Sequence, residues 1–177
     1  YVGSSTSINL FKLIKSILQS NKSIKNITTD SLNFPSDKYI CELVAKDFKI
    51  DFNFLEYGSD LIADIEKLKE FIIKKRGIIV LSHVAYKSSY RYPIKEISKF
   101  CRDNNTVVIW DLSHSIGAVN IDMGLNQVDY AVGCTYKYLN GGPGSPAFIY
   151  VREQKLRKLK SPIRGWFSHD RPFEYSD

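Results

Sequence analysis

Apolar positions along the chain follow two kinds of spacing. Four stretches carry an apolar residue at every third or fourth position, which is typical of an amphipathic helix. They predict helices over residues 8–19, behind the serine-rich residues 4–7; from Pro35, with Ile40, Leu43, Val44 and Phe48 on its apolar face; over residues 61–73; and from Pro93, with Ile94, Ile97, Phe100 and Cys101 on one side. Short apolar runs between them predict strands at residues 25–29, 51–55, 77–81, 106–110, 128–132 and 147–151.

Strands that alternate with helices predict an α/β fold, with a mostly parallel sheet covered by helices on both faces. The run at residues 77–81 has no polar alternation, as expected of a strand buried on both faces. Ligands of such sheets bind beyond the carboxyl ends of the strands. Polar residues follow three of the predicted strands, and we expect these residues, 82–83, 111–114 and 135–137, to meet at that edge.

Composition narrows the class of protein. The chain has 177 residues, which is long enough for one domain with a sizeable core. Its hydrophobic fraction of 44% is too high for a disordered chain. No apolar run is long enough to cross a membrane. The net charge of +6 is compatible with a phosphate-bearing partner. Because the lysines are scattered and lack interleaved aromatic residues, we interpret the charge as a solvated surface and expect no nucleic-acid partner.

The three cysteines indicate the compartment and the absence of a metal. Cys41, Cys101 and Cys134 stand far apart and form no C-x-x-C pair, so the sequence predicts no zinc or other metal site. An odd cysteine count without a basic and apolar leader favours the reducing cytoplasm. Because the first residue is Tyr1 and not Met, we also expect that the chain is processed or cut from something larger.

Two residues at the expected sheet edge are candidates for chemistry. Asp111 ends a buried strand and could hold a cationic group, although an aspartate there could equally cap a helix. Lys137 lies between two tyrosines and before the Gly-rich residues 141–144. Partial desolvation would lower its pKa and make it a nucleophile toward carbonyls; alternatively it is a surface lysine with a packed stem. His114 alone is more typical of a structural histidine.

Two helix starts could serve a cofactor. The serine-rich start of the first helix could bind phosphate through free backbone N–H groups, or simply cap the helix. Phe34, just before the helix at Pro35, could stack on a flat ring or act as a hydrophobic staple. A lysine that forms an imine, an acid that pairs with a ring nitrogen and a phosphate cradle are together what pyridoxal 5′-phosphate requires.

Two motifs resemble the cofactor motifs of the kynureninases, a family of pyridoxal-phosphate enzymes of the aspartate-aminotransferase fold type. They are DLSHSIG at residues 111–117 and YKYLNGGPG at residues 136–144. The similarity extends to FPSD at 34–37, LS at 81–82 and GWF at 165–167, and so covers nearly the whole chain. It implies that residues 1–177 are a single cofactor-binding large domain, without the leading segment and the C-terminal small domain of a longer enzyme.

The resemblance also implies roles for individual residues. Lys137 would bind the cofactor covalently and then act as the catalytic base, with Tyr136 as a proton donor. Asp111 would hold the ring nitrogen, and His114 would lie near the ring's phenolate oxygen. The other implied cofactor contacts are Phe34 on the ring face with Asp37 close by, Thr6 and Ser7 at the phosphate, Ser82 and Tyr136 as support, and Trp166 at the phosphate, across a dimer interface.

The implied reaction is the hydrolysis of L-kynurenine, or 3-hydroxykynurenine, to anthranilate, or 3-hydroxyanthranilate, and L-alanine. It belongs to tryptophan catabolism and NAD biosynthesis and would be carried out by a cytoplasmic homodimer. The small domain would supply the arginine for the substrate carboxylate, since Arg164 and Arg171 do not match its place. Two alternatives stay open: a cysteine desulfurase or another pyridoxal-phosphate lyase or transferase, and a truncated non-catalytic domain.

Overall fold

The computed structural model describes residues 1–174. The helices are α1 (Thr6–Ser20), α2 (Pro35–Phe48), α3 (Ile65–Lys74), α4 (Ile94–Asp103) and the short α5 (Glu153–Leu156), followed by the 3₁₀ turn η1 (Trp166–Ser168). The strands are β1 (Val2–Gly3), β2 (Asn26–Asp30), β3 (Asp51–Leu55), β4 (Ile78–Ser82), β5 (Val107–Asp111), β6 (Tyr130–Cys134) and β7 (Ala147–Val151). At the start of α1, the side chain of Ser5 accepts a hydrogen bond from the Ile8 N–H, as the serine-rich stretch predicts.

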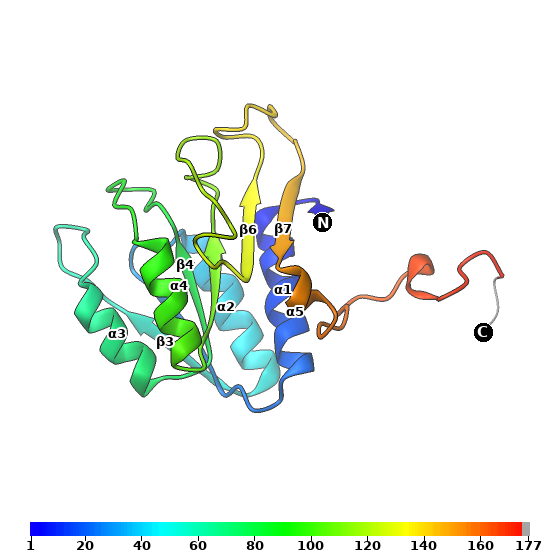
Figure 1. Cartoon of the computed structure of the whole chain (residues 1–177), viewed down its shortest axis with the longest axis horizontal. Coiled ribbons are helices and arrows are strands. Elements are labelled where there is room, and N and C mark those ends of the chain that lie inside the picture. The colour runs from blue at the N-terminus through cyan, green and yellow to red at the C-terminus, as the bar shows by residue number, and fades with distance from the viewer. Residues whose placement is uncertain (175–177) are drawn as a thin grey trace.

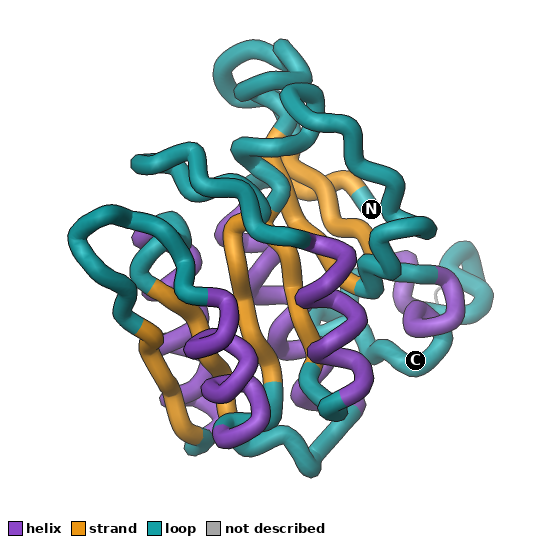
Figure 2. Tube along the Cα trace, turned by 60° about the vertical axis from the view of Figure 1, so that its left-hand side comes forward, coloured by secondary structure: helices purple, strands orange, loops and turns teal. Residues whose placement is uncertain are grey.

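All seven strands form one sheet in the order β1-β7-β6-β5-β4-β2-β3. The five strands from β6 to β3 are parallel, whereas β7 is antiparallel to β6 and β1 is antiparallel to β7. Figure 1 shows α3 and α4 on one face of this sheet and α1 and α2 on the other. The loops that follow the parallel strands gather at one end of the sheet (Figure 2). The predicted fold class, an α/β fold with a mostly parallel sheet between helices, is confirmed.

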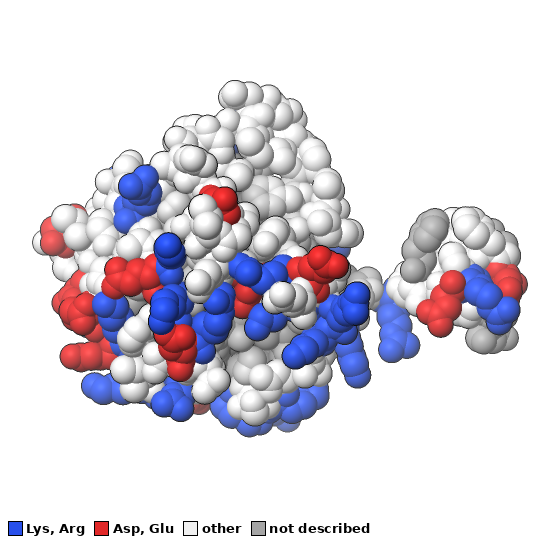
Figure 3. Space-filling model, viewed as in Figure 1, with Lys and Arg blue, Asp and Glu red and all other residues white. Residues whose placement is uncertain are grey.

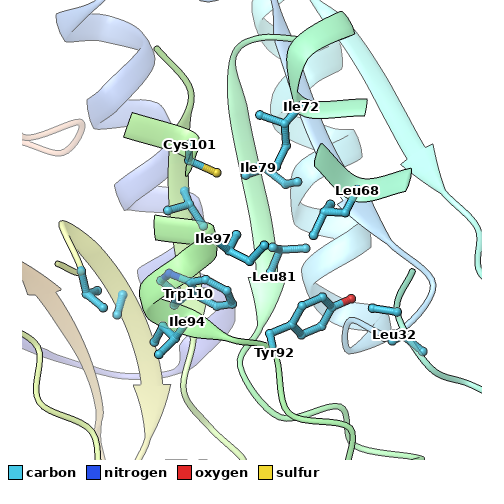
Figure 4. Packing of buried hydrophobic residues seen from close by; sticks show 14 of the residues in the cluster. Leu32, Leu68, Ile72, Ile79, Leu81, Tyr92, Ile94, Ile97, Cys101 and Trp110 are labelled. Atoms are coloured by element: carbon cyan, nitrogen blue, oxygen red, sulfur yellow. The ribbon is translucent and has the colours of Figure 1, made fainter. Parts of the chain in front are cut away.

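Each face of the sheet has its own hydrophobic cluster. Successive side chains of a strand point to opposite faces. In β4, Ile79 and Leu81 therefore pack in the cluster of α3 and α4, while Ile78 and Val80 pack in the cluster of α1 and α2. Trp110 is fully buried in the first cluster, which Figure 4 shows converging between the helices and the strands. Strand β4 is thus buried on both faces, as its unbroken apolar run predicts.

Two helices differ in detail from the prediction. The helix predicted over residues 61–73 begins four residues later, because Leu61 has left-handed backbone (φ 56°) and Asp64 caps the first turn through a bond from the Lys67 N–H. In α2, Leu43 is 48% exposed and does not face the core. The buried positions of this helix are Asp37, Cys41, Val44 and Ala45.

The last strand, β7, is only partly buried and runs against its neighbours. Residues 147–151 form a strand as expected, but only Ala147 is buried and the other four residues are half-buried. The reason is its place near the edge of the sheet, where its outer neighbour β1 has two residues. Its direction is reversed: β7 pairs antiparallel with β6, and the Gly-rich connection at residues 135–146 contains no helix of the kind that usually joins parallel strands.

In Figure 3, charged side chains of both signs are interspersed over the lower part of this face, while the loops at the top show almost none. Lys69, for example, pairs with both Glu66 (2.9 Å) and Glu96 (2.7 Å). Cys41, Cys101 and Cys134 are buried free thiols. Within residues 1–174, no group of three His, Cys, Asp or Glu side chains is arranged to hold a metal ion, and no helix combines the length and apolar character that a bilayer span requires.

Candidate active site

A cavity of about 350 Å³ opens at the carboxyl end of the parallel strands. It lies between the starts of α1 and α2, the ends of β5 and β6 and the Gly-rich loop before β7. Its volume is in the range of small-molecule sites. Of the ten site residues predicted from the sequence, seven line it: Thr6, Ser7, Phe34, Asp37, Asp111, Tyr136 and Lys137.

Lys137 and His114 are in direct contact in this site. The Nζ atom of Lys137 lies 2.8 Å from Nε2 of His114. Burial, and next to it the positive charge of Lys137, lower the pKa of His114, while Asp111 acts in the opposite direction. The imidazole is therefore favoured in its neutral form, so that Nε2 accepts a proton of the ammonium group and Nδ1 carries the ring hydrogen.

Two carboxyl groups share the floor of the cavity. Asp111, 3% exposed, accepts hydrogen bonds at Oδ1 from the Ser113 N–H (2.8 Å) and hydroxyl (2.6 Å). Asp37 is 1% exposed, and its Oδ2 is buried without a hydrogen-bond partner. Burial and then the charge of Asp111 raise the pKa of Asp37 well above its ordinary value. This favours the protonated acid at Asp37 and concentrates the negative charge of the pair on Asp111.

Another part of the cavity lining is suited to an anion. The first turn of α1 presents Thr6 and Ser7 there, beside Ser4 and Ser5. The first N–H groups of a helix have no partner within the helix and carry partial positive charge. Gly144 also lines the cavity, and its φ of 78° is the left-handed backbone that glycine adopts without strain. Backbone and hydroxyl donors thus line the same cavity as the two acids.

An aromatic wall closes one side of the site. Phe34, 37% exposed, has its ring centroid 5.4 Å from Nζ of Lys137 and 6.2 Å from the ring of His114. Tyr86 packs against it edge-on, with the ring centroids 5.1 Å apart, and lies 6.4 Å from the ring of His114. Tyr86 was not predicted from the sequence, because it lies in the irregular loop after β4, where no periodicity points to it.

Three predicted residues lie outside the lining. His114 reaches the site through its contact with Lys137. Ser82, 1% exposed, is beside Asp111 in the register of β4 and β5, behind the wall of the cavity. Trp166 borders a separate cavity, beside α1 and β7, and its Nε1 donates to the carbonyl of Pro172 (2.6 Å). The structure therefore does not bring Trp166 to the site of its own chain.

Tyr136 lies at the mouth of the cavity and is 51% exposed. Partial burial raises the pKa of its hydroxyl, followed by the effects of Cys134 and Asp111. The phenol therefore keeps its proton at neutral pH and can donate it.

The loop that carries Lys137 packs closely against Gly117. This glycine has φ 82°, and a Cβ built on it would lie 2.5 Å from the carbonyl oxygen of Tyr138. Gly117→Ala is expected to lower the free energy of unfolding by about 1–3 kcal/mol and to displace the lysine loop. Urea unfolding measures the first effect. Gly124→Ala is the control, since its Cβ would meet only the Asp122 side chain at 3.3 Å; equal losses in both variants would contradict the prediction.

A buried acid lies beneath the turn between β2 and α2. Asp30, 2% exposed, accepts at Oδ2 from the Tyr92 hydroxyl (2.6 Å) and at Oδ1 from the N–H groups of Leu32 and Asn33 (3.0 Å each). Burial raises its pKa to about 6, against the lowering effect of these bonds. The carboxylate is thus held in place by three donors and is nonetheless costly to ionise.

This raised pKa predicts a pH dependence of stability. Between about pH 4 and 6 the folded state binds the Asp30 proton more tightly than the unfolded state, so the free energy of unfolding falls as the pH rises through this window. The loss amounts to about 3 kcal/mol. Urea unfolding from pH 4 to 7.5 should show it as a difference from Asp30→Asn, which keeps the Oδ1 acceptor. Parallel curves for the two proteins would contradict it.

Comparison with known proteins places this chain in a family. The sequence profile described as Aminotransferase class-V matches residues 1–172. A kynureninase of Pseudomonas fluorescens is 40% identical over 176 residues, which cover 97% of this chain and 41% of that protein. A kynureninase of Burkholderia pseudomallei (strain K96243) is 38% identical over 171 residues, which cover 94% of this chain and 40% of that protein. The resemblance seen in the sequence is confirmed, and the chain spans about two fifths of the length of these relatives.

Solved structures show the same fold at low sequence identity. The apo structure of a cysteine desulfurase from Thermococcus onnurineus NA1 matches with a TM-score of 0.81 at 19% identity, over 93% of this chain and 41% of that one. A NifS-like protein matches with a TM-score of 0.79 at 15% identity, over 93% and 45%. These two structures support the arrangement of the sheet and helices and do not distinguish substrates.

Proposed function

The chain belongs to the aminotransferase class-V family, and from this membership and the site we propose that it is the pyridoxal-phosphate-binding part of a kynureninase. The whole enzyme would hydrolyse L-kynurenine, or 3-hydroxykynurenine, to anthranilate, or 3-hydroxyanthranilate, and L-alanine. The observation that carries the proposal is the cavity in which Lys137 and the Asp37–Asp111 pair lie beside the start of α1. The kynureninase relatives, at 38–40% identity, support the choice of substrate.

The residues of the cavity fit this cofactor. The negative charge concentrated on buried Asp111 suits a cationic N–H group, which a protonated pyridine nitrogen supplies. The donors at the start of α1, with Thr6 and Ser7, suit the phosphate. Phe34 adds an aromatic side chain to the same lining. When bound, pyridoxal phosphate stabilises negative charge that develops on the substrate α-carbon.

The chain's own residues would then move protons. Lys137, once its amine is free, is placed to remove the α-proton, and neutral His114 can hold a proton of the Lys137 ammonium at Nε2. Asp111 would keep the ring nitrogen protonated. Tyr136, whose pKa is raised, is a proton donor at the mouth of the site. Ser82 would act indirectly, since it does not line the cavity but lies beside Asp111 in the sheet.

Several parts of this proposal concern the whole protein. We propose that residues 1–177 form the large domain, that the substrate carboxylate is bound by an arginine outside it, and that the enzyme is a cytoplasmic homodimer. Trp166 lies away from the cavity of its own chain, so its proposed contact with the phosphate requires a partner subunit. Sedimentation or light scattering of the protein with cofactor would test the dimer.

The experiment that tests the function has two stages. Adding pyridoxal phosphate should produce an absorbance band near the visible edge, and borohydride reduction followed by peptide mass spectrometry should place the cofactor on Lys137. Kynurenine added to the full-length protein should then release fluorescent anthranilate. A cofactor band with sulfide release from cysteine would instead support the desulfurase alternative. Absence of any band would refute cofactor binding.

A further inference from the structure

The side chain of Asn33 uses its full hydrogen-bonding capacity inside the protein. It is 5% exposed and lies in the turn between β2 and α2. Its Nδ2 donates to Oγ1 of Thr29 (2.9 Å) and to the carbonyl of Val80 (3.2 Å). Its Oδ1 accepts from the Ser82 hydroxyl (2.5 Å) and from the Phe34 N–H (2.9 Å). An amide has two donor hydrogens and two acceptor lone pairs, so no capacity is left over.

These four bonds join two strands to the aromatic wall of the site. Thr29 belongs to β2, and Val80 and Ser82 belong to β4, so the donors of Asn33 anchor it to the sheet. Its acceptor then fixes the backbone of Phe34, the residue that precedes α2. The ring of Phe34 stands 5.4 Å from Nζ of Lys137. A shift of the turn would therefore change the distance between that ring and the amine.

The backbone of the same turn is fixed by hydrogen bonds to Asp30. The carboxylate of Asp30 accepts from the N–H of Asn33, and the Asn33 N–H also lies 3.3 Å from the carbonyl of Asp30. Tyr92, 1% exposed, fixes the other oxygen of Asp30. Because its backbone and its side chain are both hydrogen-bonded, Asn33 is fixed in one conformation and can orient the groups that it contacts.

We infer that Asn33 is a positioning residue of the site: it fixes the backbone of Phe34, and thereby the ring beside Lys137, and it holds the hydroxyl of Ser82 next to Asp111, without touching the cofactor itself. The effect of Asn33 on the cofactor rests on the proposed function. Its hold on Phe34 and Ser82 rests on the four hydrogen bonds alone. Thr29 offers a matched control. Thr29→Val keeps the shape of the side chain but removes one partner of Asn33 and the bond that the Thr29 hydroxyl donates to the carbonyl of Val80 (2.9 Å). It leaves the bonds of Asn33 to Val80, Ser82 and Phe34 in place.

The test compares Asn33→Ala with Thr29→Val, both in the empty protein and with pyridoxal phosphate. In the empty protein, hydrogen exchange at the Phe34 amide should be about tenfold faster in Asn33→Ala than in Thr29→Val. With cofactor, Asn33→Ala should lose the visible circular-dichroism band, which reports ring orientation, and bind about tenfold more weakly; Thr29→Val should keep the band. If Asn33→Ala does not fold, Asn33→Ser, whose hydroxyl is too short to span the four partners, takes its place.

Equal Phe34 exchange in the two variants would overturn the inference. So would faster exchange in Asn33→Ala with an unchanged dichroic band and unchanged affinity, because Asn33 would then have only a structural role. A wild-type protein that gives no cofactor band would refute the proposed function. The exchange measurements alone would then decide whether Asn33 holds Phe34.

Discussion

Replacement of Lys137 by alanine is expected to abolish the covalent attachment of pyridoxal phosphate and to lower the rate of anthranilate formation about 10³-fold or more. In the proposed function the lysine supplies both the amine that bonds the cofactor and the base that takes the α-proton, and a positioned base alone contributes about 10²–10⁴-fold. Borohydride reduction and mass spectrometry measure the attachment, and fluorescence of the full-length enzyme measures the rate. Lys46→Ala, an exposed lysine of α2, is the control and should change neither.

A second readout of the Lys137 variant does not depend on the cofactor. The positive charge of Lys137 lowers the pKa of His114, so the pKa of this imidazole should rise when the lysine is removed. Nuclear magnetic resonance of the three histidines would measure the change. An unchanged His114 titration would mean that the 2.8 Å contact between Nζ and Nε2 does not exist in solution.

Asp111→Asn is expected to weaken binding of pyridoxal phosphate by about 2–5 kcal/mol, the usual cost of removing one partner of a buried, hydrogen-bonded charge pair. The asparagine keeps an oxygen for the Ser113 bonds, so the fold should persist. Titration of the cofactor by absorbance measures the loss.

Asp37→Asn is the matched control for the Asp111 variant. Because the pKa of Asp37 is raised well above its ordinary value, the acid is already favoured in its neutral form, and its amide should cost less than tenfold in affinity. If the two variants weaken the cofactor equally, the negative charge is shared between the two carboxyl groups and is not concentrated on Asp111.

The pattern of the chain predicts most of the fold because local periodicity and burial on both sheet faces leave few alternatives. The unbroken run at β4 illustrates this, since each of its five residues is buried. The pattern fails where the cause is not local. The start of α3 depends on the left-handed backbone of Leu61, and the reversed direction of β7 depends on pairing with β6.

The site is predicted less completely, for a related reason. Lys137 and Asp111 carry recognisable chemistry at strand ends, so their meeting follows from the topology. Asn33, Tyr86 and Asp30 act through contacts with residues distant along the chain, such as the bond between Asn33 and Ser82, and a single sequence holds no signal for such pairs. Trp166 lies away from the cavity, and only an assembly with a second subunit could test its predicted role.

The residues that line the cavity run from Ser4 to Ala147, so no contiguous segment forms the site by itself. Five parallel strands require crossover connections, and such non-local pairings form late and slowly during folding. The cavity is therefore complete only after the central strands have assembled. A ligand that binds there stabilises the native state without helping the folding transition state, so its expected kinetic effect is slower unfolding at an unchanged folding rate.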